Sequence, residues 1–176
     1  MALTLRQMDP EELRRLEEID RTEHIETTYS MVDGVLTATH EPVDCPAWPA
    51  DGGPGSWQER AQRWGEEARG GVILGAFDGD RLAGFAILRY RLTETMAQLS
   101  VLHISRQYRR QGVGTHLVTE VFRLARESGA TSIYVSGAPT ESAIGFYQSH
   151  GFQPTPTPHP ELLALEPDDI HMVRTL

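Results

Sequence analysis

The stretch QYRRQGVGTHLV, residues 107–118, places two arginines, Arg109 and Arg110, and two glycines, Gly112 and Gly114, directly before an apolar repeat. A glycine has no side chain, so the backbone at these positions can approach a ligand closely. The free N–H groups at the start of a helix, together with the positive end of its dipole, form a site for an anion. Arginine adds charge that can be directed at phosphate. The stretch therefore predicts a turn shaped to hold a pyrophosphate group.

Two widespread phosphate-binding motifs do not fit this stretch. A dinucleotide-binding fingerprint needs a third glycine three residues after Gly114, where Leu117 stands. A P-loop needs a lysine, and all 16 basic residues of this sequence are arginine. The absence of lysine also excludes Schiff-base chemistry on a lysine side chain.

The pattern of apolar residues around this stretch predicts alternating strands and helices. Apolar residues recur at helical spacing after Val113 until Ser128-Gly129, which predicts a long helix. The turn residues at 78–80 separate two apolar runs that read as an antiparallel hairpin. Strands are expected at residues 3–6, 72–77, 81–90, 97–104, 133–136 and 170–176, and helices near residues 9–20, 57–68, 113–128 and 140–150. This order indicates an α/β domain built around a mixed sheet.

Three segments carry weaker signals. Residues 29–36 favour a small hairpin around Asp33-Gly34, and residues 42–55 are rich in proline and glycine, which is typical of a loop. Trp57 and Trp64 recur at helical spacing and either pack in the core or form a wall of an acceptor pocket. From Phe152 onward we expect a strand broken by prolines.

Composition narrows the class of protein. A chain of 176 residues has the length of one domain, here residues 1–176, and a net charge of -9 disfavours general binding to nucleic acid. No apolar run approaches the ~20 residues that cross a bilayer, and the first residues are charged, so we expect a cytoplasmic protein without a membrane segment. The single cysteine, Cys45, allows no internal disulfide.

A cluster of three carboxylates and a histidine at residues 166–172 raises the question of a metal site. The contiguous spacing does not specify one, and we expect a surface turn that leads into the last strand. No metal is predicted.

Two segments of the sequence together resemble the GNAT N-acetyltransferases, which use acetyl-CoA. Residues 109–114 match the pyrophosphate-loop pattern Arg/Gln-x-x-Gly-x-Gly/Ala of that family and follow an aromatic residue, Tyr108. Residues 140–152 look like its Asn-x-x-Ala-x-x-Phe-Tyr-x-x-x-Gly-Phe segment, at the expected distance downstream. The resemblance covers about residues 3–176. It departs from the pattern at the asparagine, for which Thr140 or Ser142 must substitute.

The resemblance implies a fold and a set of roles. The expected fold is a mixed, mostly antiparallel sheet of about six to seven strands flanked by about four helices. The strand before the loop is expected to leave its neighbour at a bulge, to pair with the pantetheine arm of acetyl-CoA, and to contact the thioester carbonyl through a backbone amide. Tyr147 aligns with the tyrosine that protonates the leaving sulfur; packing beside Phe146 is its alternative role. The residues expected to contact the cofactor are Leu102, His103, Ile104, Arg109, Arg110, Gln111, Gly112, Val113, Gly114, Thr115, Thr140, Ser142 and Tyr147.

The base that deprotonates the amine stays open among Glu23, Glu26, Glu94 and His103, with Glu23 and His103 as the leading candidates. His103 titrates near neutrality in its ordinary state, but on a strand it can equally be a structural histidine under a helix. Deprotonation through water would need no such residue.

The function implied is transfer of an acetyl group to a primary amine of a small molecule or peptide. A non-catalytic module that binds acyl-CoA is the alternative. Acetylation of charged tRNA is disfavoured by the net charge. A homodimer through the late strands is a further expectation.

Overall fold

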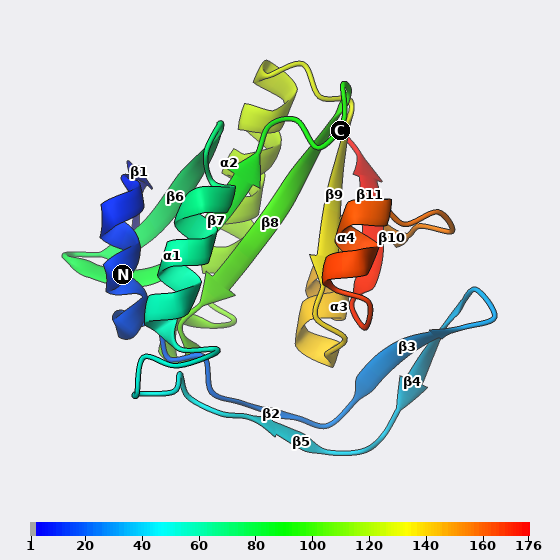
Figure 1. Ribbon diagram of the computed structural model, residues 1–176, viewed down its shortest axis with the longest axis horizontal. Helices are drawn as coiled ribbons and strands as arrows, with labels where there is room; N and C mark the ends of the chain where they lie inside the picture. The colour runs from blue at the N-terminus through cyan, green and yellow to red at the C-terminus, as the bar shows by residue number, and fades with distance from the viewer. Residues whose placement is uncertain (1–2) are drawn as a thin grey trace.

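A seven-stranded sheet forms the centre of the computed structural model, which describes residues 3–176 (Figure 1). The strands lie in the order β1-β6-β7-β8-β9-β11-β10. They are β1 (Leu3–Met8), β6 (Gly71–Asp78), β7 (Arg81–Arg89), β8 (Met96–Ile104), β9 (Ser132–Gly137), β11 (Ile170–Thr175) and β10 (Gln153–Pro154). All neighbours run antiparallel except β8 and β9, which are parallel. The expected mixed and mostly antiparallel sheet is confirmed.

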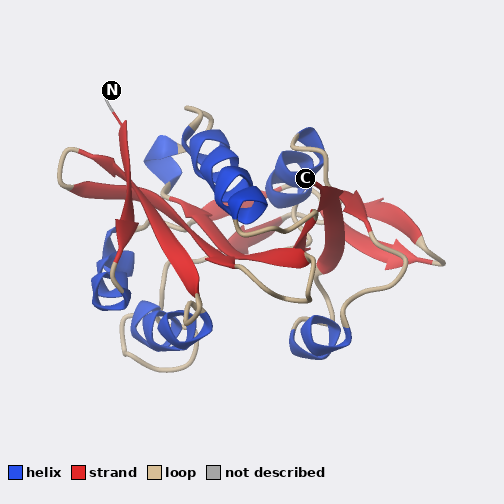
Figure 2. Cartoon of the chain, turned by 90° about the horizontal axis from the view of Figure 1, so that it is seen from above, coloured by secondary structure: helices blue, strands red, loops and turns tan. Residues whose placement is uncertain are grey.

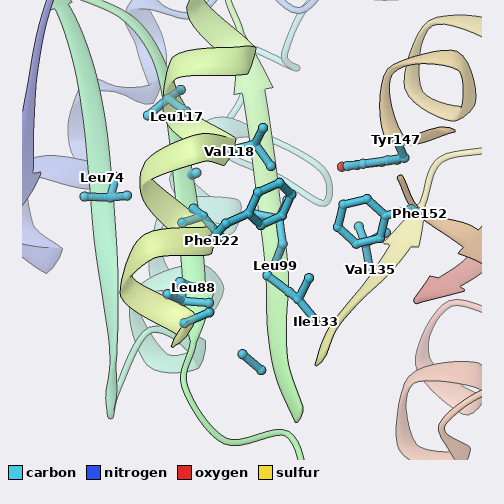
Figure 3. Close-up of a cluster of buried hydrophobic side chains, with 14 of the residues drawn as sticks. Leu74, Leu88, Leu99, Leu117, Val118, Phe122, Ile133, Val135, Tyr147 and Phe152 are labelled. Carbon is cyan, nitrogen blue, oxygen red and sulfur yellow. The ribbon is translucent and has the colours of Figure 1, made fainter. Parts of the chain in front are cut away.

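Helices cover both faces of the sheet (Figure 2). The 3-10 helix η1 (Pro10–Glu18), α1 (Trp57–Glu67) and α4 (Pro160–Leu165) lie on one face, while α2 (Val113–Glu127) and α3 (Glu141–Ser149) lie on the other. The helix predicted after Val113 is confirmed, and its apolar stripe is buried against β6, β7 and β8. Figure 3 shows this core, in which Leu117, Val118 and Phe122 of α2 face Leu74, Leu88 and Leu99 of the strands.

The two parallel strands β8 and β9 separate soon after they begin to pair. Their register covers only Met96–Gln98 against Ser132–Tyr134, although β8 continues to Ile104 and β9 to Gly137. The register between β7 and β8 shifts at the same level, because Ile87 pairs with Val101 while Leu88 pairs with Leu99. Ser100 is therefore the extra residue of a bulge, which bends β8 away from β9. The expected bulge is present, and beyond it the strands diverge (Figure 1).

The segment between η1 and α1 forms a long two-stranded ribbon. The hairpin predicted around Asp33-Gly34 is confirmed as β3 (Thr28–Val32) and β4 (Val35–Thr39), with φ of 49° and 78° at the two turn residues. The expectation of a plain loop at residues 42–55 was wrong in part, because β5 (Val43–Cys45) pairs with β2 (Glu23–Ile25). Thr28 also forms a bridge to Thr140, so the ribbon reaches the start of α3.

The strand expected after Phe152 was also wrong for most of its length. Only β10 is extended, and α4 follows. Pro160 occupies the first helical position and Glu161 the next, which is a recognised start signal for a helix. The prolines at positions 154, 156 and 158, directly before this helix, led to the prediction of a broken strand instead.

Candidate active site

The loop between β8 and α2 leaves several backbone amides free. A short 3-10 helix, η2 (Arg106–Tyr108), leads to Gly112, which caps α2 with a φ of 82° that favours glycine. The first backbone hydrogen bond of α2 runs from the N–H of His116 to the carbonyl of Gly112, at 3.0 Å. The amides of Val113, Gly114 and Thr115 therefore have no partner within the helix and are available to an anion.

Strain and charge in the loop both point to a ligand. Arg110 adopts a φ of 59°, a left-handed conformation that costs a residue with a side chain about 1–2 kcal/mol. Its side chain is exposed and forms no ion pair within residues 3–176. Gln111 donates its side-chain amide to the carbonyl of Gln107 at 2.6 Å, which holds the turn closed. The loop thus leaves the guanidinium of Arg110 and the amides at the start of α2 accessible, and their binding of a pyrophosphate stays a prediction.

The side chain of Arg109 points elsewhere. Its Nε donates to the carbonyl of Ile104 at 3.1 Å, and its two terminal nitrogens donate to the carbonyls of Thr22 and Arg21 at 3.2 and 3.1 Å. Its Nη1 also lies 3.3 Å from a carboxylate oxygen of Glu23. All three nitrogens are occupied, so the expectation that this guanidinium is directed at phosphate was wrong. Arg109 instead fastens the ribbon to the end of β8.

Gly114 serves packing between helices. A Cβ built on Gly114 would lie 3.0 Å from Cε2 of Phe146 on α3, which is tighter than ordinary contact. The missing side chain therefore lets α2 and α3 meet beside the loop. At Gly112, in contrast, an added Cβ would meet only a carbon of His116 at 3.9 Å, so the space beside this residue is open.

The edge of β8 that faces β9 is unpaired after Gln98. The N–H of Ser105 donates to the carbonyl of Ala83 on β7 at 2.9 Å. Because backbone groups alternate in direction along a strand, those of His103 also face β7, and those of Leu102 and Ile104 face the open side. The cofactor contacts expected for Leu102 and Ile104 stay predictions: their N–H groups face the open side, the Ile104 carbonyl is taken by Arg109, and the backbone of His103 faces β7.

Tyr147 lies at the opposite side of the divergence. It is buried in the core between α2 and α3, and Figure 3 shows its hydroxyl directed away from α3 and toward α2. Its ring lies against Gly137 of β9, where a Cβ would come within 3.1 Å. Burial raises the pKa of Tyr147, and the charges of Asp169 and Glu166 raise it further. The hydroxyl therefore stays protonated at neutral pH, as a proton donor must.

The first turn of α3 presents two hydroxyls. Thr140 caps the helix, because its Oγ1 accepts from the N–H of Ala143 at 3.3 Å, and it lies 3.2 Å from the Oγ of Ser142. The hydroxyl of Thr140 is thus committed to the cap, and Ser142 is the exposed member of the pair. Ser142 is the better placed of the two to substitute for the asparagine.

His103 sits in an aromatic cluster. Its ring lies 5.6 Å from Trp48, 5.4 Å from Trp64 and 5.8 Å from Phe85, centroid to centroid. Burial lowers its pKa to about 4, and the positive charges of Arg21, Arg109 and Arg60 act in the same direction. The imidazole is neutral at pH 7. A base with so low a pKa removes a proton from an ammonium group poorly.

The three glutamates considered as the base lie in different parts of the structure. Glu23 is half-buried and lies beside Arg109, while Glu26 is exposed and contacts His24 at 3.1 Å. Glu94 is exposed in the loop that precedes β8, at the far end of that strand from His103. Glu94 thus lies away from the site, Glu23 and His103 lie near the loop, and Glu26 lies at the start of α3, where its N–H donates to Glu141 at 3.3 Å.

Trp48 and the acidic turn at residues 166–169 form contacts that the sequence did not predict. The indole N–H of Trp48 donates to the carbonyl of Ile19 at 2.8 Å, which closes the aromatic cluster over His103. The expected surface turn at residues 166–169 is present, but Asp169 is half-buried, and burial raises its pKa to about 6 with the help of Glu166 and Asp168. His171, expected near the surface, is buried in β11. Trp48 and Ile19 lie 29 positions apart in the chain, and the burial of Asp169 and His171 results from tertiary packing, so no local pattern signals them.

The comparisons with known proteins agree with this geometry. The model of the acetyltransferase (GNAT) family matches residues 39–152. The chain belongs to this family. The probable N-acetyltransferase family 8 member 5 of Mus musculus is 32% identical over 87 residues, which are 49% of this chain and 36% of that protein. The chain thus matches about a third of the length of this curated relative.

Solved GNAT-type structures share the whole fold. Nourseothricin acetyltransferase superposes with a TM-score of 0.74 at 20% identity, over 99% of each chain. The PaiA N-acetyltransferase from Thermoplasma acidophilum, solved in complex with coenzyme A, gives a TM-score of 0.61 at 19% identity, over 100% of each chain. In the part of this chain that the structure describes, no helix has the length and apolar character to cross a membrane.

The low pKa of His103 can be measured directly. We expect its ring protons to titrate by NMR with a midpoint near pH 4, because the aromatic cluster and the three arginines destabilise the imidazolium. A Trp48→Ala variant should move this midpoint upward, toward 6.5, since it opens the cluster to water. A midpoint near 6.5 in the parent protein would contradict the burial described here.

Proposed function

We propose that this protein is an acetyl-CoA-dependent N-acetyltransferase that acts on a primary amine. The observation that carries the proposal is the unpaired edge of β8 at Leu102 and Ile104, which begins beside the free amides of α2 and runs toward the level of Tyr147. A bound acetyl-CoA would supply a thioester. The family membership and the coenzyme A held by the PaiA structure support that choice of cosubstrate.

The loop would hold the pyrophosphate. The amides of Val113, Gly114 and Thr115 and the positive end of α2 offer hydrogen bonds and partial charge to its oxygens. Arg110 adds a formal positive charge at the edge of the loop. The left-handed conformation of Gly112 directs the backbone into α2. The backbone groups of Leu102 and the N–H of Ile104 would pair with the amide-containing arm, as a further strand would, while the Ile104 carbonyl already accepts from Arg109.

Two groups of this chain would act in the chemical step. A free N–H of β8 stabilises the negative charge that develops on the carbonyl oxygen as the amine nitrogen attacks the carbonyl carbon. The carbon–sulfur bond then breaks, and the Tyr147 hydroxyl gives its proton to the thiolate. The amine loses one proton, which passes through water to the solvent, because His103, whose pKa burial lowers to about 4, is a weak base enclosed by aromatic rings. The tyrosinate regains its proton from solvent.

Cofactor binding can be tested with a matched pair of glycine variants. Gly112→Asp places a carboxylate at the start of α2, where it repels a pyrophosphate, and we expect acetyl-CoA affinity to fall at least about 100-fold by calorimetry. Gly129→Asp makes the same change at the other end of α2, at a similar φ of 89° against 82°, with nothing within 4 Å of the new Cβ. It should bind as the parent does. Equal losses in both variants would contradict binding at the loop.

Catalysis by Tyr147 can be tested by deleting its hydroxyl. Tyr147→Phe should lower kcat by about 100-fold or more and leave the affinity for acetyl-CoA unchanged, because only the proton donor is lost. Thiol release is followed with a panel of spermidine, L-lysine and an amino-terminal peptide. Tyr90→Phe, which removes a hydroxyl outside the site, is the control. If the parent binds acetyl-CoA and acetylates no amine, the non-catalytic acyl-CoA-binding role is favoured.

A further inference from the structure

A cavity of about 330 Å³ opens between α1 and α4, on the face of the sheet opposite α2. Its charged lining consists of four carboxylates and two guanidinium groups, from Glu66, Glu67, Glu161, Glu166, Arg69 and Arg89. Arg89 is already paired with Glu161 at 3.1 Å, and Glu67 with Arg63 along α1 at 3.4 Å. Within residues 3–176, Glu66 and Glu166 form no ion pair. Two carboxylates, one on each wall, and the guanidinium of Arg69 thus remain without an ion pair among the described residues, and the carboxylates outnumber it.

The carboxylates of the two walls act on each other. Burial raises the pKa of Glu67 and the like charge of Glu166 raises it further, while the positive charges of Arg63, Arg60 and Arg89 oppose the rise. Carboxylates that repel across a cavity are stabilised when a cation enters between them. The electrostatics of the cavity therefore favour a positively charged occupant.

Gln98 at the floor of the cavity is an independent sign of a polar ligand. This side chain belongs to a residue that is only 5% exposed, and it lines the cavity. No hydrogen bond to its amide is formed by another residue of the described chain. The amide faces the cavity without a protein partner, so a ligand bound there could pair with it.

The floor of the cavity lies at the point where β8 leaves β9. Gln98 is the last residue of β8 that pairs with β9, and Ser100, also on the floor, is the extra residue of the bulge. From Ser100 to Leu102 is a distance of about 7 Å along a strand. Glu166 is also close enough for its charge to act on the hydroxyl of Tyr147. One end of an occupant can thus reach the proposed site of acetyl transfer.

We propose that this cavity is the acceptor subsite and that it selects an amine carrying at least one further positive charge, such as a di- or polyamine. The inference rests on the proposed function. The distal cation of the acceptor lies between Glu66 and Glu166, and the amide of Gln98 bonds to an N–H of the chain. The reacting amine reaches past Ser100 to the edge of β8.

The test uses spermidine and, as a singly charged probe, n-butylamine. Binding is measured by calorimetry at one ionic strength, since salt screens charge, and acetyl transfer by thiol release. The cavity variant is Glu66→Gln with Glu166→Gln. Its matched control is Glu11→Gln with Glu17→Gln, which removes the same charge from two exposed residues of η1. We expect the parent and the control to bind spermidine alike and the cavity variant at least about tenfold more weakly.

Gln98→Leu separates a binding role from a structural one. Leucine fills a similar volume and removes the unpartnered amide, so we expect thermal stability to be retained and spermidine affinity to fall several-fold. Spermidine should be acetylated with a higher kcat/KM than n-butylamine. Equal binding in the cavity and control variants, or equal kcat/KM for the two amines, would overturn the inference. If spermidine binding depends on Glu66 and Glu166 but the parent protein transfers no acetyl group to spermidine, the proposed function is refuted. The cavity is then a cation-binding site and not an acceptor subsite.

Discussion

The limited pairing of β8 with β9 is the constraint on which the rest of the site depends. Only three residues of each strand pair before the bulge at Ser100 turns β8 away. An unpaired strand edge inside a sheet needs partners for its backbone groups. The same divergence leaves room for the Tyr147 ring against Gly137 and brings the floor of the acidic cavity to the other face. The loop amides, the open edge and the tyrosine thus share one structural cause.

Arg109 and the ribbon at residues 23–45 hold this arrangement in place. The guanidinium of Arg109 joins the last carbonyl of β8 to the carbonyls of Arg21 and Thr22. The far part of the ribbon bridges Thr140 at the start of α3 through Thr28. The two sides of the divergence are therefore tied to one segment, which covers the end of the sheet in Figure 1. An arginine that the sequence suggests for phosphate is used for this purpose instead.

Local patterns in the sequence predicted most of the fold and the position of the loop, but few of the contacts in the site. The helix after Val113 and the hairpin at Asp78-Gly79-Asp80 depend on spacing and turn residues that lie close together in the chain. The pairing of β2 with β5 joins residues 18 to 22 positions apart, and Arg109 donates to the carbonyls of Thr22 and Arg21, 87 and 88 positions away. In the sequence Gln98 stands between the apolar residues Ala97 and Leu99, and nothing in that pattern indicates that its side chain lines a cavity. These features follow from tertiary packing, which single residue patterns do not encode.

The central claim is that the open edge of β8 binds acetyl-CoA, and residue-level amide exchange by NMR tests it most directly. The N–H groups of Leu102 and Ile104 should exchange more slowly when acetyl-CoA is added. Those of Val101 and His103, which pair with β7, should exchange slowly in both states. Slowing that follows this alternation would support the account. Binding of acetyl-CoA with no change at Leu102 and Ile104, or with equal changes at all four amides, would contradict it.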